Sequence, residues 1–304
     1  MKNWVLYIGM TLVFGCGFLF LNIASQEIEP FELIAVRMTI TTLVLYLYMR
    51  MVHDEFHLSW GIAFLGIFNY ALPLSLMVWA QRQGVNSGMT SVLVATNPIF
   101  TLMIAHYAFD DERINRYKFI GVIAGFLGTI ILASRNFDGG LTSGLIGQLA
   151  IILAALLFAI TGVYSRKVMK DNQVSPVALT TGTTFVAMIV CWGFVIAGAL
   201  MGNPITDPTT VSGKAIFALF ILTFFHSILG FAVSNYIIRE LGAGMFSTMT
   251  YITPVIALIL GAIFLNEIID SAVILGTLVI LGGIAITNID ILRRVYVRSL
   301  LPLR

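Results

Sequence analysis

Residues 87–112 read SGMTSVLVATNPIFTLMIAHYAFDDE, and residues 243–267 read AGMFSTMTYITPVIALILGAIFLNE. The two stretches share Gly, Met and Ser at equivalent positions, and each carries a proline inside an apolar run, Pro98 and Pro254. Each ends in a glutamate that opens the same spacing, E-x8-G-x6-G. The chain therefore contains an internal repeat, and the sequence around it decides what fold the repeat builds.

The composition is that of a protein embedded in lipid. Hydrophobic residues make up 59% of the 304 residues and charged residues only 11%, and the mean hydropathy is +0.96. A soluble fold of this size carries about 25% charged residues, so most of this surface does not face water. The apolar runs are long and continuous and lack the strict alternation of a transmembrane barrel. The pattern predicts an all-α integral membrane protein.

Ten apolar runs are long enough to be considered as membrane spans. A span needs about 20 residues, and with short connections roughly ten spans fit this length. The predicted spans are residues 3–24, 31–50, 58–80, 86–108, 117–134, 144–166, 175–200, 214–237, 243–265 and 271–290.

The repeat divides these ten spans into two sets of five. Upstream of the opening stretches, Pro30 aligns with Pro176, which extends the repeat to the second and seventh spans. Because five is odd, the second set must enter the membrane from the opposite side, which makes an inverted repeat suited to alternating access. We expect one five-helix unit over residues 1–138, a second over 139–290, and a basic tail over 291–304.

The basic residues predict the orientation. Thirteen of the 17 Lys and Arg residues fall on the side of the membrane that holds both termini, and three fall on the other side. By the positive-inside rule, both termini are cytoplasmic in a multi-pass protein of the plasma (inner) membrane.

These features resemble the EamA-type carriers of the drug/metabolite transporter superfamily. The resemblance rests on the five-plus-five pattern, the paired prolines followed by E-x8-G-x6-G, and an arginine seven residues after a proline in the second span, Pro30 and Arg37. It implies ten helices around a central cavity, lined mainly by spans 1, 3, 4, 6, 8 and 9, and usually the export of amino acids or related metabolites. One departure is that the second-half equivalent of Arg37 is Thr183.

Of the 17 Lys and Arg residues, Arg37 alone is expected in the interior of a span rather than at one of its ends. It lies about 9 Å along the helix from the outer end of its span. Its long side chain is then expected either to reach the outer interface or to pair with Glu29 or Glu32. The alternative is that Arg37 anchors a substrate carboxylate, because an ionisable group in hydrocarbon is a functional candidate.

His226 lies at the midpoint of the eighth span, and the repeat pairs it with Tyr70 at the midpoint of the third. The two side chains are expected to border one cavity. Histidine is also the one group at this depth that titrates near neutral pH, and thus a candidate proton carrier. A histidine hydrogen-bonded between helices is the alternative.

Other polar residues at similar depths complete the predicted substrate site. They are Asn69, Trp79, Asn97, Tyr164, Asn235 and Tyr251. Aromatic walls are expected from Phe68, Phe224 and Phe225, because small-molecule sites are mostly apolar. For each residue, a hydrogen bond between helices is the alternative.

Three further groups have structural explanations. Asp110 and Asp111 are expected to form a solvated turn, and Glu112 and Glu267 to pair with bases at the interface, with coupling-ion binding as a minor alternative. Small residues let helices approach closely, which is the role expected of Gly121, Gly125, Gly128, Gly276, Gly282 and Gly283.

The paired prolines are predicted to bend their helices beside the cavity. Pro98 would leave the carbonyl of Val94 without its helical donor, and Pro254 would do the same to Thr250. Such a carbonyl must find another partner in lipid. Two bends at equivalent depths favour a gating role over two unrelated kinks.

The sequence therefore predicts a secondary transporter of small polar metabolites. An enzyme is not expected, because HExxH, GxSxG and the GxxxxGK[ST] phosphate loop are absent from the sequence. The expected partners are a small-molecule substrate and membrane lipid, with possible coupling to protons or to exchange, and with no cofactor, metal or nucleic acid. The alternatives are a drug, nucleobase or sugar-type carrier, and, in a different class, a channel or lipid-handling protein. No signal in the sequence specifies an oligomeric state.

Overall fold

The computed structural model describes residues 2–82, 85, 90, 93–133, 145–202, 205–253, 255–256, 271–287 and 289. Within these residues the chain is helical and contains no β-strand. Among the described residues, five helices are long and apolar enough to cross a membrane, namely Phe31–Met51, Trp60–Ala80, Leu145–Asp171, Pro176–Leu200 and Gly213–Leu241. Residues 291–304, the predicted basic tail, lie outside the described residues.

The described helices follow the predicted apolar runs closely. The long helices are α1 (Lys2–Ser25), α2 (Pro30–Met51), α7 (Arg116–Ala133), α8 (Leu145–Asp171), α9 (Pro176–Leu200) and α14 (Ser271–Thr287). Two further runs are composite: α3 (Trp60–Leu65), η1 (Gly66–Ala71) and α4 (Leu72–Arg82) form one, and α10 (Gly213–Ile221), η4 (Leu222–Leu229) and α11 (Gly230–Leu241) form the other. The shorter elements are α6 (Asn97–Ala108), η2 (Asp110–Glu112) and α12 (Ala243–Ser247).

Local sequence signals explain where several helices begin. Pro30 and Pro176 start α2 and α9, where the missing N–H is not needed. The hydroxyls of Ser59, Ser175 and Ser212 each accept a hydrogen bond from a backbone N–H in the first turn of the following helix. Side chains of this type supply acceptors that the first turn otherwise lacks.

Both composite runs contain a π-helical segment. These segments, η1 and η4, begin at Gly66 and Leu222, and the offset between them is the offset that aligns Pro98 with Pro254. A π-helix is rare and is frequent at functional sites. Tyr70 lies in the first segment and His226 in the second.

Pro98 does not bend a continuous helix. Residues 95 and 96 form a turn, α6 begins at Asn97, and Pro98 therefore lies in the first turn of α6. A proline at this position costs no helical hydrogen bond; the run is interrupted at residues 95 and 96, just before Pro98, rather than bent within α6, and the gating role of Pro98 stays a prediction. The hydroxyl of Thr101 donates to the side-chain oxygen of Asn97 at 3.4 Å. Pro254 lies outside the described residues.

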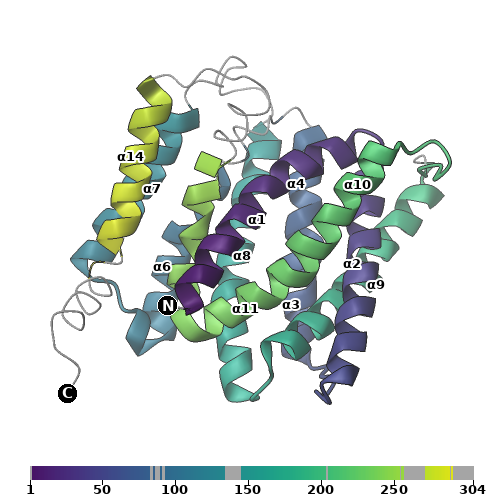
Figure 1. The fold of residues 1–304 in the computed structure, drawn as a ribbon, viewed down its shortest axis with the longest axis horizontal. Helices are drawn as coiled ribbons and strands as arrows, with labels where there is room; N and C mark the ends of the chain where they lie inside the picture. Colours follow the sequence, from purple (N-terminus) through teal and green to yellow (C-terminus); the bar gives the residue numbers. More distant parts are fainter. Residues whose placement is uncertain are drawn as a thin grey trace.

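The helices pack in pairs that join the two parts of the chain. Helix α2 packs along α9, α7 along α14, and α1 against α10 and α11, as Figure 1 shows. In the α7–α14 pair, a Cβ added to Gly283 would lie 2.6 Å from the carbonyl oxygen of Gly121. Close helix packing is therefore confirmed at Gly121 and Gly283, whereas a Cβ at Gly282 would meet no atom within 4 Å.

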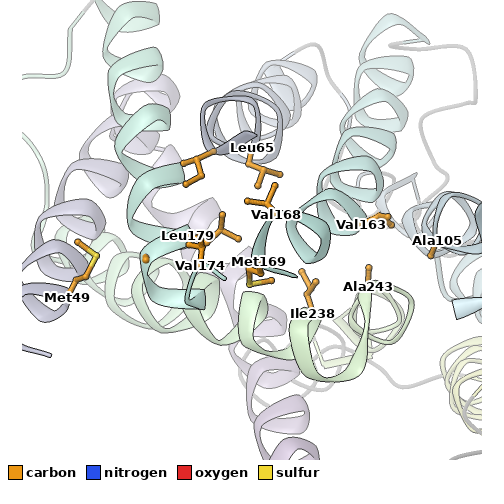
Figure 2. Close-up of a cluster of buried hydrophobic side chains, with 12 residues drawn as sticks. Met49, Leu65, Ala105, Val163, Val168, Met169, Val174, Leu179, Ile238 and Ala243 are labelled. Carbon is orange, nitrogen blue, oxygen red and sulfur yellow. The ribbon is translucent and has the colours of Figure 1, made fainter. Parts of the chain in front are cut away.

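Apolar clusters lie at both ends of the helix bundle. Figure 2 shows the larger cluster, in which side chains from α2, α3, α6, α8, α9, α11 and α12 meet near the turns that follow α2 and α8. Its members include Met169, Leu179 and Ile238. The other cluster, which includes Leu33 and Leu222, lies where α1 ends and α10 begins. Between these clusters the structure contains a cavity.

Candidate functional site

The cavity has a volume of about 220 Å³ and is bordered by α1, α2, both composite runs, α6, α8 and α12. Ligand pockets commonly measure about 300–1,000 Å³, so this one suits a small metabolite. Ile238 borders the cavity as well as the apolar cluster at one end, and Leu222 does so at the other end. The predicted site residues that line it are Arg37, Asn69, Tyr70, Asn97, His226 and Asn235.

Arg37 points into the protein. Its side chain is 3% exposed, and its Nη2 donates to Ser227 Oγ at 3.0 Å and to His226 Nδ1 at 3.3 Å. The expected pairing with Glu29 or Glu32 is wrong, because the Glu32 carboxylate accepts instead from the backbone N–H of Thr206. The register of α2 against η4 turns the guanidinium inward.

The contact with Arg37 determines the tautomer of His226. A guanidinium has donors only, so Nδ1 must accept, and in the neutral imidazole the proton then lies on Nε2. Phe14 and Phe231 contact the ring edge-on, with ring centroids 4.7 and 5.9 Å from it. The remaining edge faces Gly17, where an added Cβ would be 2.5 Å from Cδ2 and 3.0 Å from Nε2.

Tyr70 lies across Phe231 from His226. The Tyr70 and Phe231 rings stack with centroids 4.3 Å apart. The Tyr70 hydroxyl lies beside the side chains of Asn235, Asn69 and Thr183. Tyr70 and His226, from two helices far apart in the sequence, thus border the same cavity.

The three asparagines also hold helices together. Asn97 Nδ2 donates to the carbonyl oxygen of Ala155 at 3.0 Å, and Asn235 Nδ2 donates to Thr180 Oγ1 at 3.0 Å. Asn69 Oδ1 accepts from the Thr161 hydroxyl at 2.8 Å. Each amide therefore has a fixed orientation at the cavity wall.

A sequence model of the EamA-like transporter family matches residues 2–134 and 145–289. This chain belongs to the EamA-like transporter family. The resemblance of the sequence to EamA-type carriers is thereby confirmed, and this chain is an integral membrane protein of a transporter family.

Curated relatives of this chain are named as transporters. "Uncharacterized transporter YoaV" of Bacillus subtilis (strain 168) is 25% identical over 300 residues, which cover 94% of this chain and 97% of the relative. "Uncharacterized inner membrane transporter YedA" of Escherichia coli (strain K12) is 27% identical over 66% of this chain and 61% of the relative. "Probable amino-acid metabolite efflux pump" of Escherichia coli (strain K12) is 19% identical over 94% of both chains.

A crystal structure also shares the fold. It superposes on this chain with a TM-score of 0.79, the match covers 95% of this chain and 97% of the other, and the two are 17% identical in sequence. At this identity the similarity establishes the fold alone.

Three of the predicted site residues lie outside the cavity. Trp79 borders a separate groove with Glu29 and Glu32. The Tyr164 ring packs edge-on against Phe64 with centroids 5.5 Å apart. Tyr251 is buried away from the cavity, where its hydroxyl donates to the carbonyl oxygen of Val122 at 2.9 Å.

The aromatic walls differ from those expected. Phe68, Phe224 and Phe225 do not line the cavity, and the last two are 37% and 43% exposed on the outer surface of η4. The aromatic residues that do line it are Phe14, Tyr70, Phe158, Phe231 and Phe246. The π-helical turn changes which positions face inward, and the 3.6-residue period cannot anticipate this.

The sequence analysis missed two functional candidates, Ser227 and Gly17. Ser227 fixes the Arg37 guanidinium, and its hydroxyl also donates to the carbonyl oxygen of Leu222, five residues earlier, at 3.2 Å. Gly17 leaves the space that the His226 ring occupies. A serine beside a midpoint histidine and a glycine in the first span were the available hints.

Polar contacts connect the helix ends around the cavity. Glu112 accepts from the N–H groups of Ala243 and Gly244 at 3.0 and 2.7 Å and pairs with Arg166 at 2.8 Å. The predicted pairing of Glu112 with a base is confirmed, and Glu267 lies outside the described residues. Asp111 also accepts from Arg166, which lowers the pKa of the Asp111 carboxyl.

At the opposite end, Glu27 connects the turn after α1 to the start of α10. Its carboxylate accepts from the backbone N–H and the hydroxyl of Ser212 at 2.6 and 2.7 Å. These two hydrogen bonds lower the pKa of Glu27. Among the described residues, no group of three or more His, Cys, Asp or Glu side chains is arranged to hold a metal ion.

Proposed function

We propose that this chain is a secondary active exporter of small polar metabolites, such as amino acids or related compounds, and that it works by alternating access. The observation that carries the proposal is the cavity between the apolar end clusters, in which Arg37, Tyr70 and His226 meet from three helices. A largely apolar cavity with a few fixed polar groups is typical of a small-molecule site.

The proposed architecture is ten spans in two inverted five-helix units, over residues 1–138 and 139–290. Two separate matches of one family model, over residues 2–134 and 145–289, support this division. The cavity contacts support it too. Arg37 contacts His226, and their counterparts in the repeat, Thr183 and Tyr70, contact each other. A pseudo-twofold axis in the membrane plane would produce such paired contacts.

The proposed orientation places both termini in the cytoplasm of the inner membrane. In Figure 1 the N-terminal end of α1 lies at the lower end of the bundle, with the turns that follow α2 and α8. Arg50, Lys167 and Lys170 lie near those turns, as the positive-inside rule expects of a cytoplasmic face. The relative named as an inner membrane transporter supports this location.

The substrate class rests on the relative named as an amino-acid metabolite efflux pump, which is 19% identical. In the proposed cycle, the segments that contain Pro98 and Pro254 act as gates. His226 remains the candidate for proton coupling, with exchange of substrates as the other mode.

The proposal is tested by transport in vesicles that contain the purified protein. Tyr70→Phe and His226→Ala are expected to reduce the flux of a transported amino acid or metabolite while the protein remains folded and inserted. Tyr164→Phe and His57→Ala are matched controls, because neither residue lines the cavity. Undiminished flux in both cavity variants would remove Tyr70 and His226 from the site.

A further inference from the structure

We propose that the cavity selects a monocarboxylate anion with a small apolar body over the corresponding zwitterion, and that Arg37 holds its carboxylate. This inference rests on the proposed carrier function and narrows its substrate class to relatives of amino acids that lack the amino group.

The first argument is the charge balance of the cavity. Arg37 is the only Lys or Arg among the described lining residues, and no Asp or Glu is among them. The glutamates of the same helix are engaged elsewhere: Glu29 accepts from the N–H of Phe31, and Glu32 from the N–H of Thr206. A buried charge without an opposite charge is costly in a membrane protein. A bound anion would offset this cost.

The second argument is the set of donors that Arg37 leaves unused. Its Nη2 serves Ser227 and His226. Nε is buried without an acceptor, and among the described residues none accepts from Nη1. Arginine presents a planar fork of N–H groups that matches a carboxylate. A phosphate monoester would bring a charge of about −1.5 to −2 against a single guanidinium, so a monoanion fits better.

The third argument is the lack of a good partner for an ammonium group. No carboxylate faces the cavity among the described residues. The side-chain oxygens of Asn69 and Asn97 already accept hydrogen bonds from Thr161 and Thr101. An ammonium group would also meet the like charge of Arg37. The amino group of a zwitterion would therefore lose its hydration shell with little compensation.

The fourth argument is the apolar lining, which specifies the body of the ligand. Phe14, Phe158, Phe231, Leu74 and Met77 line the cavity around the polar groups. Its volume of about 220 Å³ leaves room for a short side chain. The ligand is therefore a small organic acid whose carbon chain contacts these walls.

The test uses ligands that share one carbon side chain and differ in whether they carry a carboxylate, an ammonium group or both. Purified protein is titrated with 4-methylpentanoate, leucine and 3-methylbutylamine, which share one branched chain, and with 3-phenylpropanoate, phenylalanine and 2-phenylethylamine. Affinity is read from the ligand-dependent rise in unfolding temperature. In at least one series, we expect the carboxylate to bind at least about tenfold more tightly than the matching zwitterion. A hydrogen bond to a charged group contributes a free energy of about this size.

Variants then assign the effect to Arg37. Arg37→Gln is expected to remove the carboxylate preference, and Arg37→Lys, which keeps the charge but loses the fork, to retain part of it. If either variant fails to fold, the ligand series on the natural protein still decides the question. Equal or tighter binding of the zwitterion in every series that binds would overturn the inference and leave the carrier function standing. If none of the six compounds binds and none is transported in vesicles, the result would count against both the carboxylate selectivity and the proposed carrier function.

Discussion

The guanidinium of Arg37 and the imidazole of His226 meet at 3.3 Å, although the residues are 189 positions apart. The contact crosses from α2 to the π-helical segment of the second composite run. Thr183 and Tyr70, which occupy the aligned positions, also meet. The pair of Arg37 and His226 contains a cation, whereas the pair of Thr183 and Tyr70 does not. The cavity is therefore asymmetric in charge although the chain is repetitive in sequence.

Gly17→Ala is expected to disturb the site through His226. The new Cβ would lie 2.5 Å from Cδ2 of the ring, so the imidazole must move and its contact with Arg37 must lengthen. Overpacking of this kind costs about 1–3 kcal/mol. We expect a lower unfolding temperature and a lower rate of transport in vesicles.

Gly9→Ala is the matched control for this change. Gly9 lies in the same helix, and a Cβ there meets no atom within 4 Å. Because alanine favours a helix over glycine by about 1 kcal/mol, this variant should be at least as stable as the natural protein. Similar behaviour of the two variants would contradict the proposed fit between Gly17 and His226.

Glu112→Ala is expected to loosen the contact between α6, α8 and α12. It removes the acceptor of the Ala243 and Gly244 N–H groups and one partner of Arg166. An unsatisfied buried donor costs about 1–3 kcal/mol, and we expect a loss of this size in the free energy of unfolding. Chemical denaturation in detergent measures it.

Asp110→Ala is the control for the Glu112 experiment. Asp110 pairs with Arg113 at 2.6 Å, but their side chains are 93% and 69% exposed. Exposed ion pairs contribute about 0–1 kcal/mol. If Asp110→Ala lowered the free energy of unfolding as much as Glu112→Ala does, solvent exposure would not explain the difference expected between the two carboxylates.

The contact between Glu27 and Ser212 predicts a dependence of stability on pH. Hydrogen bonds from Ser212 lower the pKa of Glu27 in the folded protein. The contact therefore stabilises the fold above the ordinary glutamate pKa of about 4.3 and is lost as the pH falls through the lower folded value. Glu27→Gln should reduce the fall in unfolding temperature over this acidic range and should not steepen it. Unfolding temperatures from neutral pH to about pH 3 measure the effect.

Pro98→Ala is expected to leave stability within about 1 kcal/mol of the natural protein, because the first helical turn needs no donor at this position. Met103→Pro, at an exposed position inside α6, is the contrasting variant. It should cost about 3 kcal/mol or more. A large loss from Pro98→Ala would restore the mid-helix interpretation. Slower transport with unchanged stability would support the gating role.

The class of the protein and most helix ranges were predictable from the sequence. Hydropathy and charge are local properties, and they place the long helices without any knowledge of packing. Pro30 and Pro176 could be matched from the repeat, and both begin helices. The pairing of Tyr70 with His226 came from the repeat alone, and the structure places both residues on one cavity.

Tertiary structure decided the direction and the partners of individual side chains. Arg37 turns inward because the register of α2 against η4 presents Ser227 and His226 to it. Tyr251 and Tyr164 lie at depths that suit a substrate site, yet their side chains contact Val122 and Phe64 instead of lining the cavity. The sequence by itself determined a repetitive, membrane-embedded helical chain, because these properties depend on composition and short-range order. Which residues border the cavity depends on rotations about helix axes, and contacts between distant segments determine those rotations.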